Sequence, residues 1–390
     1  MSISFKPTLF FCIALLSLVS QAASQSSNEI DPPNDHCVPY CSYAGLLESK
    51  QSHIEIGVEL LVFTSSISSI FSDAQVLLDE TFGSPNSAQI FNNEVKSVDP
   101  EYNPGFSLYF KYHPSVRMNT VGIAYSYIHN NADGRLSQDN STFIPVTNVT
   151  QTTMQRDKGS QHTHLHIVDF FVEKSIPVTS YLLVNLHAGM AFHSFHYSFN
   201  LKNDLNVTQT SNLGGAIVGI QDINATVNEK GNFWGVGPNM GLNFDFPFFS
   251  ASSKHDLNFI GSTNFGLICV RDYLEGSLGV STRLLINGQD TGTNSENITW
   301  KNPTVTHFIP NLDLDFKLQY RWHDINQSNV DLILALGYRF ISYWHTDQFG
   351  RNVCLFEGDS GVSLYSYRLY PRDIEDFAYC GPYFRLGVGF

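Results

Sequence analysis

The sequence predicts an all-β protein, a transmembrane antiparallel β-barrel of about ten strands, within a range of roughly eight to twelve. Three observations predict this fold: apolar and polar residues alternate with a period of two, short and long connections alternate along the chain, and the chain ends inside a strand pattern. Composition agrees, since only 15% of the 390 residues are charged and 13% are aromatic, whereas a typical soluble domain has about 25% charged residues.

The first 22 residues have the features of an export signal. Lys6 precedes an apolar stretch, "PTLFFCIALLSLV", which is followed by a small-x-small cleavage site, Ser20-Gln21-Ala22. We expect a signal peptide at 1–22, a periplasmic segment at 23–51 and the barrel at 52–390. No window approaches the ~20 apolar residues of a helical span, so a membrane form of this protein has to cross with strands.

Ten segments show the alternation that is typical of strands. In "LDLDFKLQY", Leu312, Leu314 and Phe316 share one face, while Asp313, Asp315 and Lys317 share the other. A helix would scatter these charges around its surface. The ten predicted strands lie at 54–62, 105–112, 121–128, 165–172, 182–192, 240–246, 257–268, 312–320, 330–340 and 380–390.

The connections between these segments fall into two classes. Short turns such as "HPSVR", "KSIPVTS", "PFFSASSKH" and "WHDINQSN" alternate with polar stretches rich in Asn, Ser and Thr. Outer membrane barrels have this arrangement, with short periplasmic turns and longer extracellular loops, whereas a soluble sandwich has no reason to sort its connections. We expect long extracellular loops at 64–103, 130–161, 198–231, 271–303 and 345–376, and interfacial aromatic girdles that include Tyr127, Tyr320, Trp322, Tyr343 and Trp344.

Charged residues on the polar faces of the strands are the candidates for a pore lumen, because such charges tune selectivity in channels. They are Glu55, Glu59, Lys111, Asp313, Asp315, Lys317 and Arg339. Eight strands are filled by side chains and water-filled porins have ~16 to 18 strands, so ten strands leave two alternatives. The barrel forms a narrow or gated pore for small hydrophilic solutes or ions, or its charges pair across a filled interior.

Other classes of function find less support in the sequence. The formal net charge of −14 and the absence of a Lys/Arg-rich run exclude nucleic acid as a partner. No complete nucleophile, base and acid set appears, so we expect neither an enzyme nor a cofactor. Five histidines, His162, His164, His166, His187 and His193, come from two adjacent strands, but the first three share their face with apolar residues, and we predict no metal site.

Five cysteines follow the signal segment. Cys37 and Cys41 are close enough in the chain to close a small loop, and Cys354 is a candidate partner for Cys380. Cys269 is then left free or available for an intermolecular bond.

The end of the chain, "FRLGVGF", is a further strand. Phe384, Leu386, Val388 and Phe390 alternate with Arg385 and two glycines. We expect this strand to close the barrel against the first one, near 54–62. Its terminal Phe390 resembles the signal by which the bacterial assembly machinery recognises outer membrane proteins.

Four blocks, "GNFWGVGPNMGLNFDF", "LNFIGSTNFGLI", "FIPNLDLDFKLQY" and "YCGPYFRLGVGF", resemble the Legionella and Coxiella type of pore-forming major outer membrane protein in order and spacing. The resemblance extends over about 52–390. It implies an outer membrane location, lipid contact, and porin-like or surface-interaction functions, with cysteine-dependent association. An alternative to the pore is a non-conducting surface protein or adhesin whose loops bind host or envelope partners. Homo-oligomerisation stays open.

Overall fold

A computed structural model describes seventeen segments of the chain. They are residues 52–65, 69–70, 75–78, 97–98, 101–114, 119–144, 149–179, 182–211, 217–252, 254–286, 289–301, 304, 306–323, 325, 330–344, 365–368 and 376–390. The predicted signal peptide at 1–22 and the whole of the segment at 23–51 lie outside the described residues, as do Cys37, Cys41 and Cys354. Within the described part, no helix is long and apolar enough to cross a membrane.

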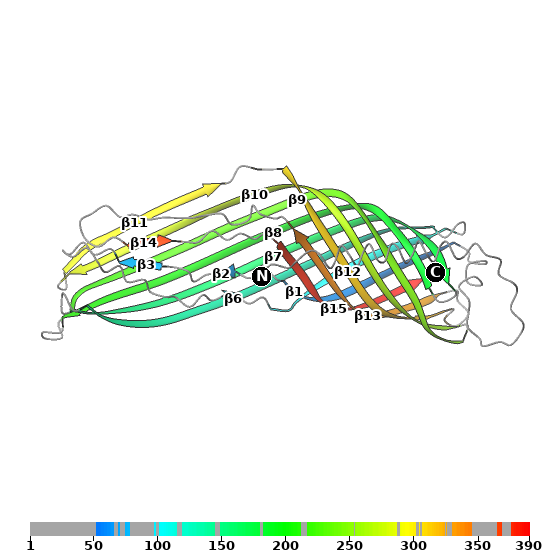
Figure 1. Ribbon diagram of the computed structural model, residues 1–390, viewed down its shortest axis with the longest axis horizontal. Coiled ribbons are helices and arrows are strands. Elements are labelled where there is room, and N and C mark those ends of the chain that lie inside the picture. Colours follow the sequence, from blue (N-terminus) through cyan, green and yellow to red (C-terminus); the bar gives the residue numbers. More distant parts are fainter. Residues whose placement is uncertain are drawn as a thin grey trace, which may run out of the picture.

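Ten antiparallel strands form a closed barrel, which confirms the predicted fold class (Figure 1). Around the ring, each strand pairs with its neighbours in the order β1-β5-β6-β7-β8-β9-β10-β12-β13-β15, and β15 returns to β1. The barrel strands are β1 (His53–Ser65), β5 (Asn103–His113), β6 (Asn119–Ile144), β7 (Val149–Thr179), β8 (Leu182–Ser211), β9 (Ile217–Ser252), β10 (His255–Ile286), β12 (Thr306–Trp322), β13 (Asp331–Trp344) and β15 (Asp376–Gly389).

Among the described residues, five further strands lie outside the ring. β11 (Gln289–Lys301) pairs with the outer part of β10. β2 (Ser69–Ile70) pairs with β4 (Ser97–Val98), and β3 (Gln75–Leu78) pairs with β14 (Tyr365–Arg368).

The last strand closes the barrel against the first, as the alternation of "FRLGVGF" predicts. Glu59 of β1 lies opposite Arg385 of β15 in the register. The backbone N–H of Ile54 donates to the carbonyl of Phe390 at 2.7 Å, and the N–H of Phe390 donates back to Ile54 at 2.9 Å. These bonds satisfy backbone groups that an open sheet edge would leave unpaired.

The outer face of the ring is apolar over roughly ten residues of each strand. Leu60, Leu108, Phe170, Phe316 and Leu336 are examples, with exposed fractions from 48% to 66%. A tilted strand needs about 9 to 11 residues to cross a bilayer. This band is therefore the lipid-facing surface, and the intervening residues face the lumen.

Five strands are much longer than a bilayer requires. β6 has 26 residues, β7 has 31, β8 has 30, β9 has 36 and β10 has 32. Their outer parts continue the sheet past the apolar band, and Figure 1 shows this extension running to one end of the molecule. The loops predicted at 130–161, 198–231 and 271–303 are therefore wrong for most of their length.

These segments form strands and not loops because their residues alternate between two faces. Polar residues point outward, whereas Ala132, Leu201, Val227 and Leu278 on the other face are at most 7% exposed. Each strand keeps its cross-strand partners, such as Asn200 opposite Asn228, so the polar backbone is satisfied. The high content of Asn, Ser and Thr, which is typical of loops, concealed a sparse period-2 pattern of small apolar residues.

Candidate functional site

The half of the barrel that is nearest to the short turns contains a polar cavity of about 570 Å³. By the rule for outer membrane barrels, this end is periplasmic. The cavity wall includes the strand ends His53, His113 and His323. The structure places all seven predicted lumen residues on this wall: Glu55, Glu59, Lys111, Asp313, Asp315, Lys317 and Arg339.

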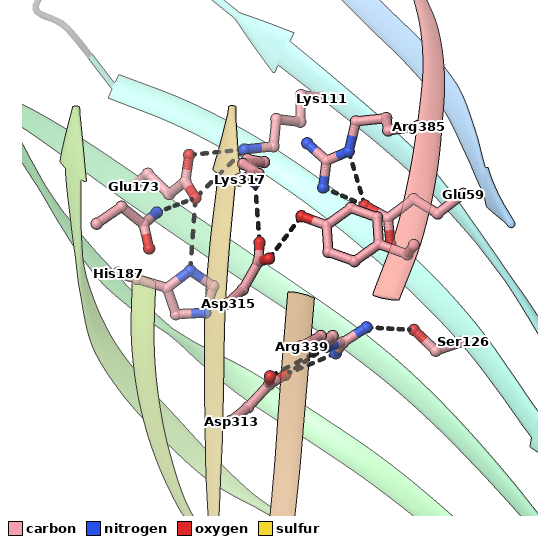
Figure 2. Close-up of polar contacts among 12 residues, drawn as sticks. Glu59, Lys111, Ser126, Glu173, His187, Asp313, Asp315, Lys317, Arg339 and Arg385 are labelled. Atoms are coloured by element: carbon pink, nitrogen blue, oxygen red, sulfur yellow. Dashed lines mark hydrogen bonds and ion pairs between the residues drawn. The ribbon is translucent and has the colours of Figure 1, made fainter. Parts of the chain in front are cut away.

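Two ion pairs connect the first strand to β12 and to the closing strand, β15. The Arg321 guanidinium of β12 donates to Glu55 of β1 at 2.9 Å. Since β13 and β15 lie between β12 and β1 in the ring, this pair reaches across part of the lumen. Arg385 donates to Glu59 through Nε at 2.7 Å and also through Nη2 (Figure 2).

A second group surrounds Glu173 of β7. Lys111 Nζ lies 3.2 Å from Glu173 Oε2, and the side-chain amide of Asn243 donates to Oε1 at 3.0 Å. His187 Nδ1 lies 3.6 Å from the same Oε1 (Figure 2). Neither Glu173 nor its His and Asn neighbours were among the predicted lumen residues. The alternation of "IVDFFVEK" places Glu173 inward and could have identified it.

A third group lies on β12, β13 and β15. Arg339 donates to Asp313 at 2.6 Å through Nη2, and reaches Ser126 of β6 at 3.2 Å. Lys317 pairs with Asp315 at 3.0 Å (Figure 2), and Tyr383 also donates to Asp315. Every predicted lumen charge thus has a described partner, so the charges compensate one another inside the barrel.

Inward-facing glycines let large rings cross this narrow interior. A Cβ added at Gly57 or Gly387 would overlap the hydroxyl of Tyr109, and one at Gly337 would lie 2.6 Å from the ring of Tyr383. Tyr109 therefore lies over two glycines, with the Arg385 guanidinium 4.6 Å from its ring centre. Glycine is required at these positions because the tyrosine side chains occupy the space that a Cβ atom would need.

Toward the outer side, the cavity ends at an apolar layer. The ring centres of Phe195 and Phe377 lie 4.8 Å apart, those of Tyr343 and Phe377 4.7 Å apart, and those of Phe195 and Phe233 5.1 Å apart. All four side chains are at most 3% exposed. We call Phe195, Phe233, Tyr343, Phe377 and the buried Leu61, Phe63, Ile128, Leu165, Ile268, Ile309 and Ile341 around them the aromatic layer.

Hydrogen bonds fasten the aromatic layer across the lumen. Tyr343 of β13 bonds to Nδ1 of His193 on β8 at 2.7 Å, and the hydroxyl of Tyr379 on β15 donates to Thr163 of β7 at 2.8 Å. Strands on opposite sides of the ring are therefore in direct contact. The prediction of Tyr343 as a girdle residue is wrong, because this side chain is fully buried in the layer.

The histidines of the two adjacent strands lie on opposite faces. His164 and His166 face outward, where they accept or donate hydrogen bonds with Tyr127 and Tyr125 at 3.0 and 2.9 Å, whereas His187 and His193 line the cavity. Among the described residues, no group of three or more His, Cys, Asp and Glu side chains is arranged to hold a metal ion.

The remaining predicted site residues lie at the surface. Cys269 and Cys380 are free thiols on the outward face of β10 and β15. The predicted pairs involve Cys37, Cys41 and Cys354, which are outside the described residues, so both pairings stay predictions. Phe390 is 55% exposed at the short-turn end, and its role in assembly likewise stays a prediction.

A closed ten-strand barrel with an apolar outer band and a charged interior defines the class of protein, an outer membrane β-barrel. Residues 49–390 match the family described as Legionella pneumophila major outer membrane protein precursor. The chain belongs to this family, and the resemblance found in the sequence is confirmed.

Solved structures similar to this chain have low sequence identity and low TM-scores. The Escherichia coli outer membrane protease OmpT is 9% identical over 88% of this chain and 99% of its own, with a TM-score of 0.34. The Ralstonia pickettii toluene transporter TbuX is 6% identical over 88% and 90%, with a TM-score of 0.20. The Pseudomonas putida toluene transporter TodX is 5% identical over 90% and 92%, with a TM-score of 0.22. None of the curated proteins matches the chain significantly.

Proposed function

We propose that the protein is a gated outer membrane pore for small hydrophilic solutes or ions, and that the described conformation is its closed state. The observation that carries this proposal is the polar cavity of about 570 Å³ that ends at the aromatic layer. A barrel that served only as an anchor would have no need to keep such a space. At about 30 Å³ for each water, the cavity has room for roughly nineteen water molecules.

The aromatic layer has the properties of a gate. Apolar constrictions block ions by excluding water, even without complete steric closure. Phe377 is central because its ring stacks on both Phe195 and Tyr343. It is the second residue of β15, so a displacement of the first residues of this strand would change the layer directly.

Single-channel recording in planar bilayers tests the proposal, with Phe377→Ala as the opening variant. We expect brief or small current steps from the wild type, and larger or longer openings from the variant. Phe384→Ala is the matched control, because Phe384 lies on the same strand but is 44% exposed on the lipid face. This control is expected to conduct like the wild type.

The pore proposal fails if correctly folded wild-type protein and Phe377→Ala both give no current steps. Folding is checked in the same preparations by the different gel migration of boiled and unboiled samples. A result in which Phe384→Ala and Phe377→Ala change conductance equally would contradict the role of the aromatic layer as the gate.

A second candidate function is a surface protein that binds host or envelope partners. The extension of β6 to β10 favours it, because these strands continue to one end of the molecule (Figure 1) and expose polar side chains such as that of Lys158 on their outward face. Removing the paired strand ends 140–144 and 149–153, together with the residues between them in the sequence, should then reduce attachment of cells to a host surface while leaving conductance unchanged. Attachment that is unaffected by this deletion would argue against a role for this hairpin.

A further inference from the structure

The outward face of the extension carries three basic residues in one row. Arg135 of β6 lies directly opposite Lys158 of β7, and Lys158 lies directly opposite Lys202 of β8. All three side chains are exposed. Opposed residues on one face of a sheet have Cβ atoms about 4.5 to 5.5 Å apart, so these three form a single basic row.

Such a row is unfavourable for the isolated protein. Like charges placed directly opposite one another destabilise a sheet, and only 22 of 390 residues in this acidic chain are Lys or Arg. Lys202 has a weak, exposed ion pair with Asp204 at 3.2 Å. Among the described residues, Arg135 and Lys158 have no acidic partner. An external anion bound at the row would relieve this repulsion.

The basic row lies on the same face of the sheet as the lipid-contacting band. Between the two, His129 of β6, His164 of β7 and His196 of β8 form another in-register row, with the rings of His129 and His164 centred 5.2 Å apart. Two residues nearer to the apolar band on the same face, the ring of Tyr127 stacks on that of His164, with the ring centres 6.2 Å apart. Tyrosine rings such as that of Tyr127 are typical of the membrane interface.

The distance from this interface to the basic row limits the kind of anion. Arg135 lies six residues beyond His129, which is about 20 Å along the strand at 3.3 Å per residue, or about 15 Å along the membrane normal at the usual tilt of 35° to 45°. The headgroup layer of a phospholipid bilayer is only about 5 to 8 Å deep. A phospholipid headgroup is therefore too short, whereas a lipid with an oligosaccharide headgroup reaches this height.

We propose that the basic row binds phosphate groups on the saccharide headgroup of an outer-leaflet glycolipid whose acyl chains pack on the apolar band below. Arg135 supplies a bidentate fork for a phosphate, and Lys158 and Lys202 supply point charges on either side of the same site. The contact would hold the long extension upright against the lipid layer. This proposal does not depend on whether the barrel conducts.

Binding of purified lipopolysaccharide to the full chain, folded in zwitterionic detergent, tests this proposal. We expect Lys158→Gln to weaken binding about five-fold, as for one basic residue near an anionic lipid surface, and the triple variant R135Q/K158Q/K202Q to weaken it on the order of a hundred-fold. Lys174→Gln is the matched control. Lys174 lies on the same strand and the same outward face, and is exposed at the opposite end, so this variant should bind like the wild type.

Two further arms identify the bound group. Dephosphorylated lipopolysaccharide should bind about as weakly as intact lipopolysaccharide binds to the triple variant, and phosphatidylglycerol vesicles should bind equally to Lys158→Gln and Lys174→Gln. Without lipid, Lys158→Gln should be at least as stable as the wild type, because it removes repulsion; a merely structural lysine would give the opposite sign. The proposal is overturned if Lys158→Gln binds lipopolysaccharide like the wild type, or if dephosphorylation has no effect.

Discussion

The two halves of the barrel interior share the same strands but have opposite chemistry. On β13, the inward series runs through Gly337 and Arg339 in the periplasmic half and then through Ile341 and Tyr343 in the outer half. Arg339 bonds to Asp313 and Ser126 beside the cavity, whereas Tyr343 stacks on Phe377. A step of two residues along one strand therefore separates a polar space from a dry layer.

This comparison shows that strand geometry decides which residues face inward but not whether the interior contains water. In the periplasmic half, paired charges and amide side chains line the space and keep it polar. In the outer half, large rings from β8, β9, β13 and β15 meet across the lumen. Substitutions in the periplasmic half and substitutions in the outer half should therefore affect stability and conductance in different ways.

The largest effect is expected from Arg339→Ala. This change leaves Asp313 as an uncompensated charge in the lumen, and removing one partner of a buried pair typically costs about 3 to 5 kcal/mol. The free energy of unfolding in urea with phospholipid vesicles measures it. The control is Arg283→Ala on the extension, since the pair of Arg283 with Asp290 is exposed at 2.8 Å and should contribute less than about 1 kcal/mol. Equal losses for the two variants would mean that the lumen pair is as solvated as a surface pair.

A somewhat smaller loss of stability, about 3 kcal/mol, is expected from Phe377→Ala. Truncation of a buried phenylalanine usually costs about 3 to 5 kcal/mol, and the neighbouring rings can close part of the space. Phe384→Ala on the lipid face of the same strand should cost much less, because lipid fills the gap. The same unfolding measurement compares them, and a larger loss at Phe384 would show that the outer half is not a packed core.

The smallest expected effect is a pH dependence of the protein's stability, which arises from His323 at the periplasmic rim. His323 follows β12 and lies 2.7 Å from Asp256 and 3.0 Å from Asp331, and these two carboxylates raise its pKa above the ordinary 6.5. A group whose pKa is higher in the folded state than in the unfolded state stabilises the folded protein. This stabilisation is fully present below about pH 6.5, the unfolded-state pKa, and is lost as the pH rises through the folded-state pKa. The contribution is about 0.5 to 1 kcal/mol, because the group is partly exposed.

His323→Gln should therefore remove the part of the pH dependence between pH 6 and pH 9 that the wild type shows in its unfolding midpoint. The variant and the wild type should converge at high pH, where His323 is neutral in both the folded and the unfolded state of the wild type. A wild-type midpoint that rises from pH 6 to pH 9 relative to the variant would contradict the sign of this prediction.

Much of the barrel could be predicted from alternation alone. The pattern in "LDLDFKLQY" placed Asp313, Asp315 and Lys317 inward, and all three line the cavity. A period of two is a local property, so it identifies faces reliably. The partners of these charges could not be predicted, because Glu55 and Arg321 are 266 positions apart in the chain and meet only when the ring closes.

The aromatic layer and the extension were missed for related reasons. Phe195, Phe233 and Phe377 look like lipid-facing or girdle residues until the inward phase of each strand is fixed by its neighbours. In the extension, polar composition outweighed a weak alternation that only the continued pairing of five strands makes stable. Local patterns therefore predicted the membrane-spanning part well, and cooperative pairing decided the rest.

Accessibility of the cavity from each side of the membrane tests the central claim most directly. Ser262 lines the cavity, and Ser262→Cys, in a variant whose other cysteines are replaced by serine, reports access by a small membrane-impermeant thiol reagent in proteoliposomes of known orientation. We predict fast modification from the periplasmic side, slow modification from the outer side, and faster outer modification when Phe377→Ala is added. Equal rates from both sides in the parent variant would contradict a cavity closed by the aromatic layer.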